Sequence, residues 1–181
     1  SAGRLEAAIL SGGASLEART GAAQKLKRLV SLASIGPAEA SAQILGLSQR
    51  VENSLLASFH MAFDAGDQES MRRSASILFA YNGGASCIQS FVGQHEFFQS
   101  PTSPELIKTK YLMPGYLVNY HDGTEEEADP ALTSVFDQIV ATSEEDWKYL
   151  QKVFENPSQV MDTLLTRIFQ EPVQVCLEET L

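Results

Sequence analysis

The sequence has only two cysteines and no run of apolar residues longer than five, and each shortage excludes a class of protein. Cys87 and Cys176 are far apart, so they form neither a disulfide framework nor a metal-binding cluster. We expect two reduced core cysteines in a cytoplasmic protein. The longest apolar run, 77–81, is far shorter than the roughly 20 residues that a membrane-spanning helix needs. An integral membrane protein is therefore excluded.

Basic residues are also scarce. The 181 residues include 13 Lys and Arg against 23 Asp and Glu, which gives a net charge of −10. Nucleic-acid backbones and anionic lipid headgroups both attract basic surfaces. The charge therefore argues against a nucleic-acid partner and against direct insertion of this segment into a membrane.

Motifs that carry catalysis or hold a cofactor are missing. The His95-Glu96 pair begins like a zinc-protease helix, but the second histidine that this motif needs is absent. The glycine pairs lack the lysine of a phosphate-binding loop. A helical enzyme stays a minor alternative, and it requires a polar pocket that joins Ser86, His95 and Glu96. We predict a protein that is not an enzyme and has no cofactor and no metal.

Helical periodicity dominates the first half of the chain. From Glu39 to Phe63 the apolar residues fall three or four positions apart, which is typical of one face of an amphipathic helix. Asp67 is a predicted N-cap for the next helix, and Asn82-Gly83-Gly84 is a predicted end, because glycine adopts the left-handed conformation at low cost. The segment Ala85–Phe98 is a third predicted helix. The predicted buried positions of the first two helices are Ile44, Leu47, Val51, Leu55, Phe59, Ala62, Phe63, Met71, Ala75, Leu78 and Tyr81.

A further helix is predicted over Leu16–Ala33. Its apolar stripe is thin, rich in alanine and close to heptad spacing, which suits contact with another helix better than a deep core. The candidate partner contacts are Ala22, Leu26, Leu29 and Ala33.

The segment 99–130 interrupts the helical pattern. It holds four of the seven prolines and an acidic run, so we predict a surface loop, with a brief extended piece over Tyr111–Tyr120. Asp129-Pro130 and Asn156-Pro157 are helix-start signals, and Pro172 is predicted to kink or shorten the last helix. No convincing strand is found. The predicted fold is an all-α antiparallel helical bundle, divided into segments 1–35, 36–98, 99–130 and 131–181.

One stretch of the sequence resembles a known family. Residues 81–98 read Tyr-Asn-Gly-Gly-Ala-Ser-Cys-Ile-Gln-Ser-Phe-Val-Gly-Gln-His-Glu-Phe-Phe. This text resembles the signature of the exocyst subunit usually called Sec-ten (exocyst component five), especially in its fungal members. Val153-Phe154 and residues 157–170 resemble a second segment of that family. The positions that carry the resemblance as a structural motif are Asn82, Gly83, Gly84, Phe91, His95 and Phe98.

The resemblance implies the fold of a longer protein. The family has a long N-terminal coil followed by stacked helical bundles that form a rod. Residues 1–35 then end the coiled-coil region, 36–98 are the first helices of the bundle, and 131–181 continue the bundle after the loop 99–130. The chain opens on Ser1 rather than Met, and both ends have a helical pattern. We therefore expect a fragment of a longer protein.

The resemblance also implies a function. The exocyst holds secretory vesicles at the plasma membrane before SNARE-mediated fusion, so a non-enzymatic tethering subunit is expected. Its partners would be the other exocyst subunits, notably the Sec-fifteen subunit, and indirectly Rab/Arf-type small GTPases and SNAREs. The expected location is the cytoplasm, with recruitment to secretory vesicles and exocytic sites. Gly93 departs from the family's usual Asn. The F-box protein recyclin, an adaptor that shares this domain, therefore stays the alternative.

Overall fold

The structure is a computed structural model that describes residues 2–95, 98 and 130–170. Every regular element in these residues is helical and none is a strand, which confirms the prediction of an all-α helical bundle. The described residues divide into two compact units. The predicted loop and extended piece within 99–129 and the predicted effect of Pro172 lie outside the described residues.

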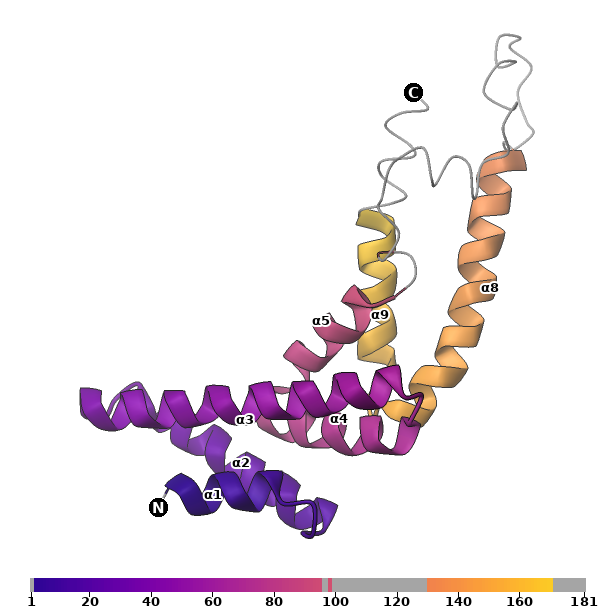
Figure 1. Cartoon of the computed structure of the whole chain (residues 1–181). Coiled ribbons are helices and arrows are strands. Elements are labelled where there is room, and N and C mark those ends of the chain that lie inside the picture. The colour runs from indigo at the N-terminus through magenta and orange to yellow at the C-terminus, as the bar shows by residue number, and fades with distance from the viewer. Residues whose placement is uncertain (1, 96–97, 99–129, 171–181) are drawn as a thin grey trace. The chain divides into compact units, whose positions relative to one another are not determined.

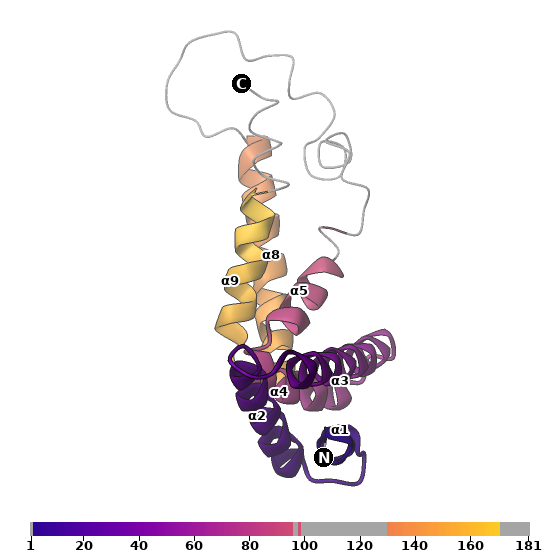
Figure 2. The same cartoon turned by 90° about the vertical axis from the view of Figure 1, so that its left-hand side faces the viewer.

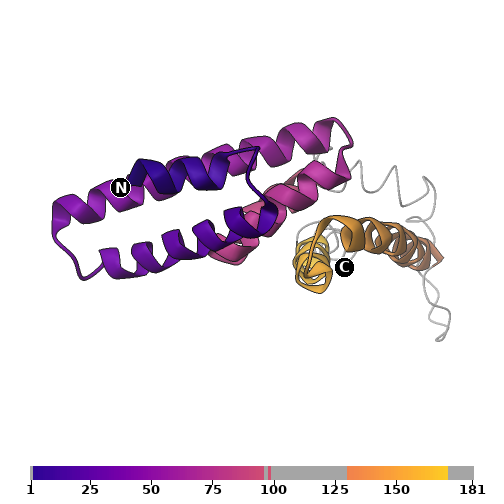
Figure 3. The same cartoon turned by 90° about the horizontal axis from the view of Figure 1, so that it is seen from below.

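Among the described residues, the first unit comprises 2–90 and Lys152–Glu155. Its helices are α1 (Ala2–Leu10), α2 (Leu16–Ala33), α3 (Ala38–Asp64) and α4 (Gln68–Asn82). Helices α3 and α4 lie side by side and run in opposite directions, and α2 packs on α1, α3 and α4 (Figures 1, 2 and 3). These contacts join α1 and α2 to α3 and α4 within the first unit.

Local sequence signals set the starts of α2 and α4. The Ser15 hydroxyl accepts a hydrogen bond from the Ala18 backbone N–H at 3.2 Å. The Asp67 carboxylate accepts one from the Ser70 N–H at 3.0 Å, which confirms its predicted role as N-cap. Hydrogen bonds from the Ser70 hydroxyl and backbone lower the pKa of Asp67. Each cap satisfies a backbone donor that the first helical turn leaves without a partner.

The core of this unit uses the predicted apolar stripes of α3 and α4. Ile44 and Phe63 at the ends of the α3 stripe are only half-buried. The buried members of the two stripes are Leu47, Val51, Leu55, Phe59, Ala62, Met71, Ala75, Leu78 and Tyr81. The Tyr81 hydroxyl forms a hydrogen bond with the buried Ser48 hydroxyl, so the polar end of the tyrosine is satisfied inside the core.

Among the described residues, the second unit comprises 91–95, 98, 130–151 and 156–170. Helix α5 (Ala85–Gly93) begins in the first unit and ends in the second. Helices α8 (Pro130–Val153) and α9 (Pro157–Ile168) form an antiparallel hairpin, and both start at the predicted prolines (Figures 1 and 2).

Helix α5 is shorter than the predicted helix over Ala85–Phe98. After Gly93 the chain makes tighter turns, in which the N–H groups of Gln94 and His95 donate to the carbonyls of Phe91 and Val92 at 3.1 and 3.2 Å. These are bonds to the third preceding residue rather than the fourth, so the α-helix ends there. The predicted C-terminal boundary of this helix was wrong by several residues.

Candidate interaction surface

The motif Asn82-Gly83-Gly84 is a reversal between α4 and α5. Gly83 and Gly84 both have a backbone φ of +76°, in the left-handed region that favours glycine. Their N–H groups donate to the carbonyls of Phe79 and Leu78 at 3.0 and 3.3 Å, which satisfies carbonyls at the end of α4. The sequence at this point therefore encodes a sharp change of chain direction.

Asn82 ties this reversal to its neighbours. Its side-chain oxygen accepts a hydrogen bond from the Gly84 N–H at 2.9 Å. Its side-chain nitrogen donates to the Glu52 carboxylate of α3 at 2.7 Å and to the Ser86 hydroxyl of α5 at 3.0 Å. One side chain thus connects three helices, and Ser86 is used in this contact.

The remaining motif residues make contacts within the second unit. Phe91 stacks on Tyr149 of α8, with ring centroids 6.1 Å apart. His95 Nε2 lies 2.9 Å from Asp146 Oδ2 of α8. Phe98 lies beneath the guanidinium of Arg167 of α9, 4.2 Å from its ring centroid. The three side chains hold the end of α5 and the residues that follow it against α8 and α9.

The polar groups that a helical enzyme would need have other partners. His95 is largely buried against Asp146, and Ser86 is bonded to Asn82. Glu96 lies outside the described residues. Among the residues with described positions, no three His, Cys, Asp or Glu side chains come together as a metal-holding group. In that same part of the chain, no helix has the length and apolar character needed to cross a membrane.

Cys87 is a buried thiol on α5. Burial raises its pKa to about 12, because the thiolate would lose its hydration inside the protein. In a Cys176→Ser variant we expect no reaction with a thiol reagent at pH 8 under native conditions, and full reaction after unfolding in urea. Counting labelled thiols by mass spectrometry over several hours tests this. Rapid labelling of the folded chain would contradict it.

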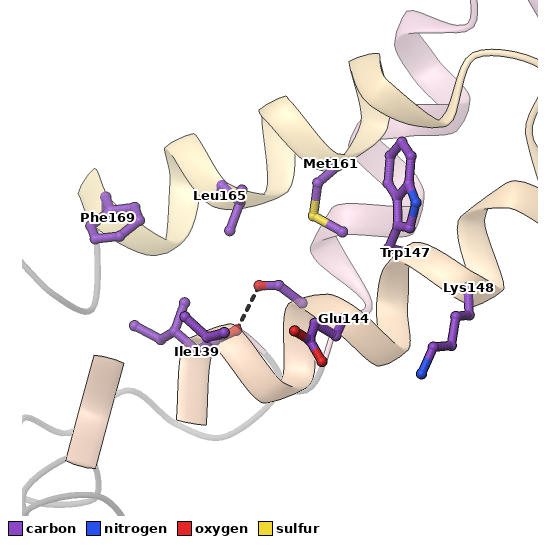
Figure 4. A pocket seen from close by; sticks show the side chains of 9 residues that line it. Ile139, Glu144, Trp147, Lys148, Met161, Leu165 and Phe169 are labelled. Carbon is purple, nitrogen blue, oxygen red and sulfur yellow. Dashed lines mark hydrogen bonds between the residues drawn. The ribbon is translucent and has the colours of Figure 1, made fainter. Parts of the chain in front are cut away.

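An apolar groove of about 540 Å³ runs between α8 and α9 (Figure 4). Val140 and Phe169 are 57% and 44% exposed. The polar side chains at the groove are Ser143, which donates to the Ile139 carbonyl at 2.6 Å, and Glu144 and Lys148. The apolar lining consists of Ile139, Val140, Trp147, Met161, Leu165 and Phe169.

The spacing of this lining suits a helix. Met161 and Leu165 lie four residues apart on α9, and Phe169 follows four residues later at its C-cap, so the three form a ridge on one side of the helix. The adjacent row of α9, which is Val160, Leu164 and Ile168, is fully covered. A groove with apolar walls can pack against the apolar side chains of a helix.

The sequence itself contains a signal for this groove. Apolar residues occupy two adjacent rows of α9 rather than one. Two rows are wider than a single neighbouring helix covers, so one of them is left partly exposed.

The four predicted partner contacts on α2 differ in their burial. Ala22, Leu26 and Ala33 are buried within the first unit, whereas Leu29 is 40% exposed. Three of the four positions are thus covered by the chain's own helices. Of the four positions, Leu29 therefore stays the predicted contact with a partner.

Comparisons with known proteins agree on one family. Residues 21–181 match the family described as exocyst complex component Sec10-like, alpha-helical bundle. The chain is 25% identical over 141 residues to exocyst complex component 5 of Dictyostelium discoideum, which covers 75% of this chain. It is 39% identical over 51 residues to exocyst complex component SEC10 of Saccharomyces cerevisiae, which covers 28% of this chain.

These matches confirm the resemblance read from the sequence to an exocyst subunit, while a fungal origin stays a prediction. The aligned part spans only 14% of the Dictyostelium protein and 6% of the yeast protein. No solved structure matches the chain at a significant level.

Proposed function

Because the chain belongs to the Sec10-like exocyst component family, we propose that it is part of a non-catalytic subunit that tethers secretory vesicles to the plasma membrane before SNARE-mediated fusion. The match of residues 21–181 to this helical-bundle family is the observation that carries the proposal. The family and the matched relatives support a vesicle-tethering type of exocyst component.

The described surfaces support a role in assembly. The groove between α8 and α9 is apolar and suited to helix packing, and His95 and Ser86 are engaged in contacts between segments. Exocyst subunits are generally structural rather than catalytic. The recyclin-like F-box adaptor is not favoured, because the matched relatives are exocyst components.

Membership of the family supports assembly with other exocyst subunits. We also propose close pairing with the Sec-fifteen subunit, indirect contact with Rab/Arf-type GTPases and SNAREs, and recruitment from the cytoplasm to vesicles and exocytic sites. The proposed domain organisation assigns 1–35 to the end of a coiled-coil region and 36–98 and 131–181 to the bundle.

A quantitative pull-down tests the proposed function. The full-length protein is tagged at its own locus, purified from its native cells, and its associated proteins are quantified by mass spectrometry. We expect the other exocyst subunits in amounts comparable with the tagged protein. Recovery of ubiquitin-ligase scaffold proteins without exocyst subunits would favour the F-box adaptor, and recovery of the protein alone would refute the tether proposal.

A further inference from the structure

We propose that the exposed flank of α2 binds an acidic amphipathic helix of another exocyst subunit. This inference rests on the proposed function, since it assigns a surface and a partner chemistry to that assembly. We refer to the flank as the outer stripe. Its residues are Lys25, Arg28, Leu29, Leu32 and Ile35.

The outer stripe is separate from the part of α2 that the bundle buries. Positions 25, 28, 29 and 32 follow the i, i+3, i+4, i+7 pattern, so their side chains lie along one flank of the helix. Leu29, Leu32 and Ile35 are 40%, 57% and 83% exposed. Ile35 lies just past the end of α2, in the turn toward α3. Three large apolar side chains are thus exposed one after another, two on the flank of α2 and one in the turn that follows it.

The charge of this stripe is opposite to that of the chain. Helix α2 carries four of the 13 basic residues but only one of the 23 acidic residues. Lys25 and Arg28 are exposed, and neither forms an ion pair within the part of the chain that the structure describes. A partner helix with an apolar row flanked by Glu or Asp would cover the leucines and neutralise both cations.

The same chemistry argues against two other occupants. A second copy paired through the same stripe would supply no opposite charge for Lys25 and Arg28, because the stripe carries no Asp or Glu. A membrane-surface helix needs a broad apolar face, but the broad face of α2, which includes Leu26, is buried in the bundle. The net charge of −10 also repels anionic lipids.

The first test compares two variants of the full-length protein in its native cells. Leu32→Asp/Ile35→Asp places carboxylates on the outer stripe. Met61→Asp changes a residue of α3 that is 74% exposed and lies outside the stripe. We expect about a tenfold lower recovery of at least one exocyst subunit with the stripe variant, because two apolar contacts are lost and like charges face each other. Met61→Asp should recover all subunits as the wild type does.

The second test identifies the occupant without disturbing the surface. A photo-crosslinking amino acid replaces Ile35 in the full-length protein, and the crosslinked peptide is sequenced by mass spectrometry. A crosslink to an acidic amphipathic segment of another exocyst subunit supports the proposal. Charge exchange then checks the contact: Lys25→Glu/Arg28→Glu should weaken recovery, and Glu→Lys changes in the crosslinked segment should restore it.

Other outcomes overturn the inference. These are a crosslink to the same chain, to a second copy or to lipid, and undiminished recovery of every subunit with the stripe variant. Failure of the proposed function would give a different result, because the wild-type protein would then recover no exocyst subunits at all. Thermal unfolding of both variants is measured in parallel, and we expect no change because the substituted side chains are more than half exposed.

Discussion

Gly84→Val is expected to lower the free energy of unfolding by about 3 to 5 kcal/mol. A Cβ atom at Gly84 would lie 2.4 Å from Cε2 and 2.5 Å from Cδ2 of Phe79, which is closer than such atoms approach. The valine would also have to adopt a φ of +76°, which a β-branched residue strongly disfavours. Urea unfolding followed by circular dichroism measures the change.

The neighbouring glycine is the matched control. Gly83 has the same φ of +76°, but a Cβ atom there meets no other atom within 4 Å. Gly83→Val should therefore cost only the backbone strain, about 1 to 3 kcal/mol. Equal losses at the two positions would show that contact with Phe79 does not limit this turn.

Phe154→Ala is expected to destabilise the first unit by about 3 to 5 kcal/mol. The Phe154 ring is 4% exposed, and its centroid lies 6.0 Å from that of Phe59 on α3 and 6.1 Å from that of Phe79 on α4. The segment Lys152–Glu155, distant in sequence, belongs to this unit. Removing the ring leaves a cavity between α3 and α4 that both helices line. Thermal and urea unfolding measure the loss.

Phe169→Ala is the control for that prediction. Phe169 is the same residue type but is 44% exposed at the end of the groove between α8 and α9. Its removal should cost about 1 kcal/mol or less. A loss as large as that of Phe154→Ala would mean that the groove is covered in solution.

The two larger predictions concern the same cluster. Phe79 lies over Gly84 and against Phe154, so a side chain at position 84 would push the Phe79 ring toward Phe154. A Gly84→Ala/Phe154→Ala double variant should then be less destabilised than the sum of the single variants, because the cavity accepts the displaced ring.

Most helix starts could be predicted from the sequence because their signals are local. Asp67, Pro130 and Pro157 lie at or next to helix starts as predicted, and Gly83 ends α4. Each effect acts within one turn of the helix, through a side chain that caps the backbone or a fixed φ angle. The predicted end of α5 was wrong, because the apolar pattern continues past Gly93 while the α-helix ends there.

The sequence alone determined the all-α class, the places where helices begin and the family, because capping, proline and glycine geometry and motif text are properties of neighbouring residues. Only the tertiary structure decided which apolar rows are covered. It buries Leu26 but leaves Leu29 and Leu32 exposed, and it covers Leu164 but leaves Phe169 partly open. Burial depends on which helices meet, and that choice is made by residues far apart in the chain.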